Sequence, residues 1–262
     1  MTESERSAAL ETIAAEIRTC TRCRLHEGRT KAVPGEGHPS TEVVFVGEGP
    51  GFNEDRQGRP FVGRAGDLLV RLLGDVGWRR EEVFITNVVK CRPPDNRDPQ
   101  PDEIAACEPY LRRQLEILDP ALVVTLGRHS MGRFMPGARI GQAHGTTRPA
   151  DPATGAADAT VFAMYHPAAA LRSLEVERQS REDVRAIPAV LVEARKRREA
   201  ARSSADDAHE PDAPGQPRPP EQPRASEAPP PAPPSDARNG ALPTVMTVAD
   251  DPNHADDQMP LF

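Results

Sequence analysis

The chain has 262 residues, a formal net charge of −7 and 29 prolines. No apolar run approaches the length of a membrane span, and no secretory signal is visible. These features argue against an integral membrane or secreted protein, so we expect a cytoplasmic protein without a membrane partner.

Composition divides the chain near residue 200. Residues 201–262 contain 14 of the 29 prolines, 4 arginines and 11 acidic residues, without an apolar period. Such a segment cannot bury enough apolar surface to offset the entropy of ordering, which predicts a disordered tail. Residues 1–200 carry 29 basic and 29 acidic residues, so the predicted folded domain is neutral and the acidic balance belongs to the tail. We expect a monomer.

Strands and helices alternate along the predicted domain. The apolar runs predict short buried strands, and the longer periodic segments predict helices. In chain order these elements are a helix at 4–18, a strand at 43–46, a helix at 64–76, a strand at 83–88, a helix at 103–118 that Pro109 interrupts or restarts, a strand at 121–126, a short helix to 134, a loop-rich hairpin at 138–160, a strand at 161–165 and a helix at 181–199. This order predicts an α/β fold, a three-layer α/β/α sandwich around a mainly parallel four-stranded sheet.

The loop after the first strand is the first place to look for chemistry. The segment VVFVGEGPGFNEDRQGRPFVGRAG, residues 43–66, holds a strand, then a Gly- and Pro-rich loop with Glu48, Glu54 and Phe61. Ligands of open α/β sheets bind beyond the carboxyl ends of the strands. A phosphate-binding turn fits poorly, because no GxGxxG opens the helix and the carboxylates would repel phosphate.

Four cysteines need an explanation other than disulfides, which are disfavoured in the cytosol. Cys20 and Cys23 form a C-x2-C pair, and Cys91 and Cys107 a C-x15-C pair. Two such pairs supply the four thiolates of a structural zinc site or of an iron–sulfur cluster, and the spacing alone does not decide between them. The remaining alternative is four unrelated buried cysteines.

Polar groups follow three of the predicted strands. Glu48, Glu54 and Phe61 follow the first strand, Asn87 ends the second and His166 follows the fourth. Singly, each has an ordinary structural explanation, such as a turn former, a helix cap or a core ring. Together they offer an aromatic face, an amide edge, an imidazole and carboxylates, which is what an enzyme needs to hold a nucleobase taken out of its stack.

These residues carry a family resemblance. The segments GEGPGFNEDRQGRPFVGRAG, TNVVKCRPPDNRDP and YHPAAALR, with the four-cysteine spacing, resemble the family 4 uracil-DNA glycosylases, the iron–sulfur members of that superfamily. The resemblance covers about residues 5–197. It implies a DNA repair enzyme that flips deoxyuridine out of uracil-containing DNA and hydrolyses its N-glycosidic bond, and a 4Fe-4S cluster on Cys20, Cys23, Cys91 and Cys107.

The resemblance also implies roles for the pocket residues. Phe61 would stack on uracil, and the Asn87 amide would accept from N3–H and donate to O4, a pattern that cytosine cannot match. His166 would donate to O2 as negative charge builds on the departing base.

Other roles follow for the loop after the first strand. Glu54 would stand near uracil C5 and crowd out the methyl group of thymine, and Glu48 would position the attacking water or stabilise the sugar cation. Gly49 stands where family 1 enzymes carry an aspartate, so the identity of the water-positioning group stays open. Backbone N–H groups from Gly47 to Gly51 would contribute base contacts.

Two further segments suggest macromolecular contacts. By the resemblance, Leu171 would enter the duplex as the base leaves, with Arg172 beside it, although Leu171 could also simply pack a short helix. Arg64 and Arg172, with Arg59 and Arg128, are candidate phosphate contacts. The last residues, Gln258–Phe262, resemble the peptide by which bacterial repair proteins dock on the sliding clamp.

Two other functions fit the sequence less well. A relative that traps uracil-DNA covalently would carry a basic, His-containing insertion after the second strand, and the loop RPPDNRDPQPDE has no histidine. A non-catalytic iron–sulfur DNA-binding or scaffold protein would not need the complete set of Glu48, Phe61, Asn87 and His166.

Overall fold

The computed structural model describes residues 1–207, with side chains to residue 203. Most of the predicted tail, including the Gln258–Phe262 peptide, lies outside the described residues. The last helix, α9, continues to Asp207 and so passes the boundary predicted at residue 200.

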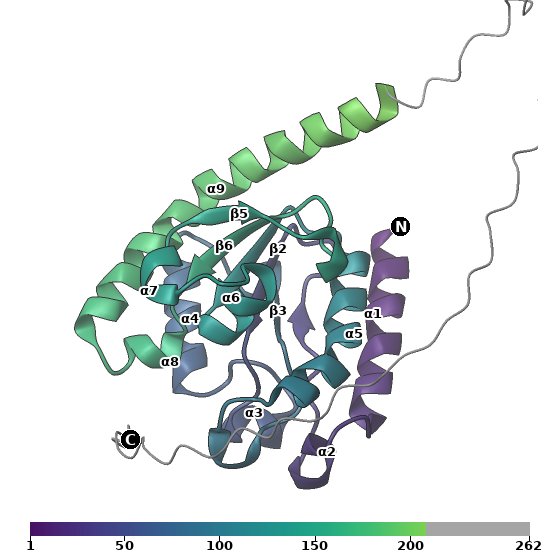
Figure 1. Ribbon diagram of the computed structural model, residues 1–262, viewed down its shortest axis with the longest axis vertical. Coiled ribbons are helices and arrows are strands. Elements are labelled where there is room, and N and C mark those ends of the chain that lie inside the picture. Colours follow the sequence, from purple (N-terminus) through teal and green to yellow (C-terminus); the bar gives the residue numbers. More distant parts are fainter. Residues whose placement is uncertain (208–262) are drawn as a thin grey trace, which may run out of the picture. The chain divides into compact units, whose positions relative to one another are not determined.

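A six-stranded sheet forms the centre of the described part, in the order β1-β3-β2-β4-β6-β5 (Figure 1). The four inner strands are parallel, as predicted, and β1 and β5 pair antiparallel at the edges. The prediction of four strands therefore missed both edge strands. The strand bounds are β1 Glu36–Gly37, β2 Val43–Gly47, β3 Phe84–Asn87, β4 Leu122–Leu126, β5 Thr147–Pro149 and β6 Thr160–Met164.

Helices cover both faces of the sheet, which gives the predicted three layers. Their bounds are α1 Glu3–Thr19, α2 Leu25–Gly28, α3 Phe52–Gln57, α4 Arg64–Asp75, α5 Pro101–Leu118, α6 Arg128–Phe134, α7 Ile140–Ala143, α8 Pro167–Ala170 and α9 Leu174–Asp207, with single 3-10 turns at Arg80–Glu82, Pro94–Asn96 and Pro152–Thr154. In Figure 1, α1 and α5 lie together on one side of the sheet, and α4, α8 and α9 lie on the other.

Each inner strand is buried on both faces. In β2, Val44 and Val46 pack into the core under α1 and α5, while Val43 and Phe45 pack into the core under α4 and α9. This double burial explains why the strands are continuous apolar runs without alternation.

Pro109 does not interrupt α5, contrary to the prediction. The helix runs unbroken from Pro101 to Leu118. A proline removes only one backbone donor from a helix, and the buried residues Cys107, Tyr110 and Leu111 hold the turns on either side against the core.

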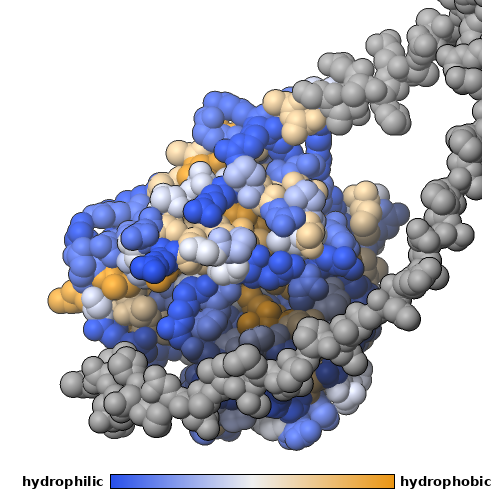
Figure 2. All heavy atoms as spheres, in the orientation of Figure 1, coloured by the Kyte–Doolittle hydropathy of each residue, from blue (hydrophilic) through white to orange (hydrophobic). Residues whose placement is uncertain are grey.

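The outer surface is mainly polar. On the face drawn in Figure 2, hydrophilic residues predominate and apolar residues are scattered. Within residues 1–207, no helix combines the length and apolarity that a membrane crossing requires.

Candidate active site

A cavity of about 650 Å³ opens at the carboxyl ends of β2, β3, β4 and β6. The structure brings the predicted residues from three separate strand ends to this one cavity, whose lining includes Glu48, Gly49, Glu54, Phe61, Asn87, His166 and Arg172. Because the strands are parallel, residues that follow them meet at one edge although more than a hundred residues separate Glu48 from His166.

Asn87 is the last residue of β3 and is 1% exposed. Its Oδ1 atom is buried and has no hydrogen-bond partner in the described structure. A buried amide oxygen without a partner costs about 1–3 kcal/mol, so this atom is poised to accept from a ligand.

Gly47, opposite Asn87 in the β2–β3 register, leaves the space around this amide open. A Cβ atom at Gly47 would lie 2.4 Å from Asn87 Oδ1 and 2.6 Å from Phe61 Cζ. Any side chain at this position would collide with both groups, so glycine is required where the amide and the ring approach each other.

Phe61 occupies a strained backbone conformation, with φ of 50°. Its carbonyl oxygen accepts from Arg80 Nη1 at 2.9 Å, and Arg80 is in turn paired with Glu36 at 2.8 Å. This backbone conformation costs on the order of 1 kcal/mol of free energy. The ring is thereby held at the cavity wall, stacked against the His166 ring with centroids 5.6 Å apart.

Glu54 supports the same loop. Its Oε1 atom accepts from the backbone N–H groups of Val62 at 2.8 Å and Gly63 at 2.9 Å, immediately after Phe61. Its carboxylate also lines the cavity. Glu54 therefore fixes the Phe61 loop in addition to facing any bound ring.

His166 is a neutral hydrogen-bond donor at the cavity wall. It caps α8, with Nδ1 accepting from the backbone N–H of Ala168 at 3.1 Å. Burial lowers the pKa of His166 to about 4, with a further lowering by Arg172 that Glu54 opposes. A neutral imidazole that accepts at Nδ1 carries its proton on Nε2, which is then the donor.

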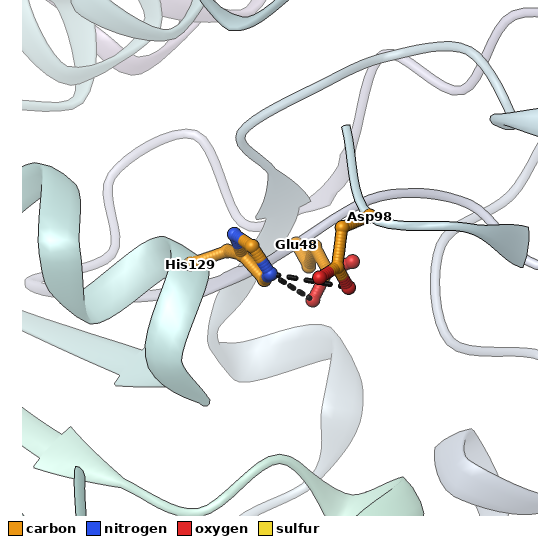
Figure 3. A group of neighbouring side chains, drawn as sticks. All are labelled: Glu48, Asp98 and His129. Carbon is orange, nitrogen blue, oxygen red and sulfur yellow. Dashed lines mark ion pairs between the residues drawn. The ribbon is translucent and has the colours of Figure 1, made fainter. Parts of the chain in front are cut away.

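Glu48 is part of a charged cluster that also contains Asp98 and His129 (Figure 3). His129 Nε2 lies 3.8 Å from Glu48 Oε2 and 3.2 Å from Asp98 Oδ1. Arg128 pairs with Asp98 at 2.5 Å and supplies a cation to the cluster. Burial raises the pKa of Glu48; Asp98 raises it further, and His129 and Arg128 oppose the rise.

Three residues near the cavity were not predicted from the sequence, namely His129, Asp98 and Arg80. A signal for His129 was present, because Gly127 and Arg128 follow the end of β4 at the same sheet edge as Glu48 and Asn87. Asp98 lies in an irregular loop and Arg80 in a single 3-10 turn, where no periodicity marks them.

The four cysteines line one small pocket between α1, α5 and the segment after β3. Cys91 Sγ accepts from Arg29 Nη1 at 3.1 Å, and Cys107 Sγ accepts from the Lys90 backbone N–H at 3.2 Å. Burial raises the pKa of Cys107 to about 12. None of the four forms a disulfide.

The candidate DNA contacts differ in their surroundings. Arg59 forms an ion pair with Glu36, and Arg128 forms one with Asp98. Arg64 and Arg172 are exposed, and neither forms an ion pair with a described carboxylate. In the segment predicted to supply a wedge, Leu171 is half-buried against the core, whereas Leu174 is 86% exposed.

The fold and the cavity define a class of protein. A parallel sheet carries at its carboxyl edge a buried amide with a free acceptor, an aromatic ring and a neutral imidazole donor, which suits an enzyme that binds a planar, hydrogen-bonding heterocycle. The family model of the uracil DNA glycosylase superfamily matches residues 34–187. The chain belongs to this superfamily.

Curated relatives agree with this assignment. The type-4 uracil-DNA glycosylase of Sulfurisphaera tokodaii is 46% identical over 185 residues, which cover 68% of this chain and 83% of the relative. That of Saccharolobus solfataricus is 47% identical over 188 residues, 70% of this chain and 86% of the relative. That of Thermotoga maritima is 45% identical over 181 residues, 68% of this chain and 93% of the relative.

Proposed function

We propose that this protein is a uracil-DNA glycosylase of DNA repair, which removes uracil from DNA and leaves an abasic site. The buried Asn87 oxygen without a partner is the observation that carries the proposal, because it offers an acceptor where an everted base would lie. The superfamily membership and the type-4 relatives support the same activity.

Asn87 reads the base by its hydrogen-bonding edge. Its Oδ1 accepts from uracil N3–H and its Nδ2 donates to O4, while Phe61 stacks on the ring. Cytosine presents an acceptor at N3 and a donor at N4, so both contacts become repulsive. A site that leaves buried polar groups unpaired with the wrong base achieves large discrimination.

His166 stabilises the leaving group. The N1–C1′ bond breaks with its electron pair remaining on uracil, and His166 Nε2–H donates to O2 of the resulting anion. Preorganised donors of this kind are usually the largest catalytic contribution. The imidazole starts neutral, because burial keeps the pKa of His166 at about 4.

Glu48 and Glu54 act on opposite parts of the substrate. Glu48 faces the sugar, where it stabilises the developing cation and receives the proton of the water whose oxygen bonds to C1′. Glu54 stands near C5 and excludes the methyl group of thymine. Backbone N–H groups around Gly47 and Gly49 add base contacts, and Gly49 lies in the cavity lining.

A 4Fe-4S cluster on Cys20, Cys23, Cys91 and Cys107 completes the proposal. The four thiols share one pocket, and N–H groups reach three of the sulfurs, as is usual for cluster ligands. The resemblance of the four-cysteine spacing to that of the family 4 enzymes favours the cluster over a single zinc ion.

The DNA strand is proposed to run past α4 and α8. Arg64 and Arg172 contact phosphates, and an apolar side chain from the segment after His166 enters the duplex, where it offsets the cost of unstacking. Leu171 is the candidate for this wedge. Comparing Leu171→Ala with Leu174→Ala in excision from double- and single-stranded DNA tests it, because only a wedge variant loses activity selectively on duplex DNA.

The tail is proposed to bind the sliding clamp through Gln258–Phe262, with the long acidic segment as a tether that raises the local concentration of enzyme on replicating DNA. The support is the sequence alone. Replacement of Leu261 and Phe262 by alanine should abolish binding to the immobilised clamp and leave excision from a free oligonucleotide unchanged.

One gel tests the central proposal. The protein is incubated with a labelled oligonucleotide that contains a single uracil, and the product is treated with alkali. A cleaved product supports excision, and a heat-stable shifted band would support covalent trapping. If neither product forms, the protein is a DNA-binding protein without catalysis. Asn87→Ala should lose activity, and the exposed-site control His38→Gln should retain it.

A further inference from the structure

The pocket that contains the four cysteines is lined by cations and not by carboxylates. Its lining includes Arg22, Arg29 and Lys90, and the described residues around it include no aspartate or glutamate. Four metal-bound thiolates make a centre anionic, and a buried anion needs cations or hydrogen-bond donors beside it. The lining therefore fits the cysteine-bound 4Fe-4S cluster of the proposed function.

The three cations are directed at different groups. The Lys90 ammonium donates to three oxygen atoms. The Arg22 guanidinium lies 4.9 Å from the centre of the Tyr110 ring. Among the described side chains, the cation that donates to a cysteine sulfur is Arg29, whose Nη1 lies 3.1 Å from Cys91 Sγ. The hydrogen bond to sulfur thus distinguishes Arg29 from the other two.

The guanidinium of Arg29 is shared between two partners. Nη1 donates to Cys91, and Nη2 donates to the backbone carbonyl oxygen of Arg18 at 3.0 Å, in the last turn of α1. Cys91 is 7% exposed, so water has little access to replace the donor. A hydrogen bond from a charged donor is about twice as strong as one between neutral groups. Arg29 therefore fixes the position of the Cys91 sulfur relative to α1.

We propose that Arg29 is a positioning residue for the cluster, whose hydrogen bond holds the Cys91 ligand and stabilises the more reduced form of the cluster. The proposal rests on the cluster of the proposed function. A donor and a positive charge beside a ligand sulfur stabilise the added electron of the reduced cluster, which raises the reduction potential. Hydrogen-bond partners of metal ligands also increase metal affinity, by about 10- to 100-fold.

The test compares the purified holoprotein of Arg29→Met with that of the wild type. Methionine removes the charge and both N–H contacts but keeps a long side chain. The midpoint potential of the cluster, measured by voltammetry, should become more negative. The visible absorbance of the cluster should decay roughly tenfold faster in the presence of an iron chelator.

Two further variants separate the hydrogen bond from the charge of the pocket. Arg29→Lys keeps the charge but loses the planar fork, so it should shift the potential in the same direction by less. It keeps the test decisive even where Arg29→Met assembles no cluster. Arg22→Met is the matched control, because it removes a cation of the same lining and leaves the backbone N–H donor to Cys20 Sγ in place. It should change the potential less than Arg29→Met and keep the wild-type rate of cluster loss.

An unchanged potential in Arg29→Met would overturn the proposal, even with faster cluster loss, because a purely structural anchor for α1 gives that result. Equal changes in Arg22→Met and Arg29→Met would also overturn it. A wild-type protein without iron would overturn the cluster and this proposal with it. A wild-type protein that holds the cluster but excises no uracil would overturn only the proposed activity, so the failures are distinguishable.

Discussion

The proposed base-reading role of Asn87 gives the sharpest prediction, through Asn87→Asp. The aspartate keeps an acceptor for uracil N3–H but replaces the donor to O4 with a second oxygen. Asn87 is 1% exposed, so the lost hydrogen bond is not replaced by water. A buried polar group left unpaired costs about 1–3 kcal/mol, which corresponds to roughly a 5- to 150-fold loss in uracil excision.

The same change should admit cytosine. An oxygen in place of the Nδ2 group accepts from cytosine N4–H, where the asparagine presents a donor against a donor. Burial also raises the pKa of a carboxyl group, and the protonated form can donate to cytosine N3. Cytosine excision should therefore appear at a low rate, and the ratio of cytosine to uracil excision should increase as the pH falls.

Single-turnover rates on matched oligonucleotides with uracil or cytosine opposite guanine measure both effects. Asn87→Ala is the control, because it removes both contacts and should lower uracil excision without any gain on cytosine. An Asn87→Asp protein that kept wild-type selectivity would refute the edge-reading assignment.

Three other predictions concern the supports of the site. The pKa of His166 is about 4 in the folded protein and about 6.5 in the unfolded chain, so between these pH values only the unfolded chain takes up this proton as the pH falls. The free energy of unfolding, measured by urea titration, should therefore fall by about 2 kcal/mol from pH 7.5 to 5, and by less in His166→Gln. Cys107→Ser should lose the brown visible absorbance expected of the cluster, and an unchanged spectrum would exclude it as a ligand. Arg80→Met frees the carbonyl of Phe61 and should lower excision about tenfold, whereas Arg79→Met, at the exposed neighbouring arginine that pairs with Glu82, should not. Equal rates in the two variants would show that the strained Phe61 backbone needs no such support.

The inner strands were predictable because both faces of each are buried, which makes their sequences continuous apolar runs. The edge strands were not. β1 has two residues and β5 three, they contain glycine or proline, and their pairing is set by tertiary contact with β3 and β6. A short helix, α3, was also missed, because its sequence FNEDRQ has no apolar period.

The site divides in the same way. Residues directly after a parallel strand could be placed together from the sequence, since the sheet brings its carboxyl ends to one edge. Contacts that bring a loop residue to that edge could not be predicted from the sequence. Asp98 reaches Arg128 by an ion pair, and Arg80 reaches the carbonyl of Phe61 by a hydrogen bond, between segments that no sequence period relates.

Lys90 links the cysteine pocket to the residues at the base-binding cavity. Lys90 is fully buried, and its Nζ donates to Asn87 O at 2.8 Å, Thr86 Oγ1 at 2.6 Å and Gln114 Oε1 at 2.7 Å. Its backbone N–H donates to Cys107 Sγ. The backbone of Asn87 is thus fixed from the side of the cysteines. Since a displaced amide would no longer match the edge of uracil in the proposed base-reading role, we expect changes in the cysteine pocket to affect base selection through structure.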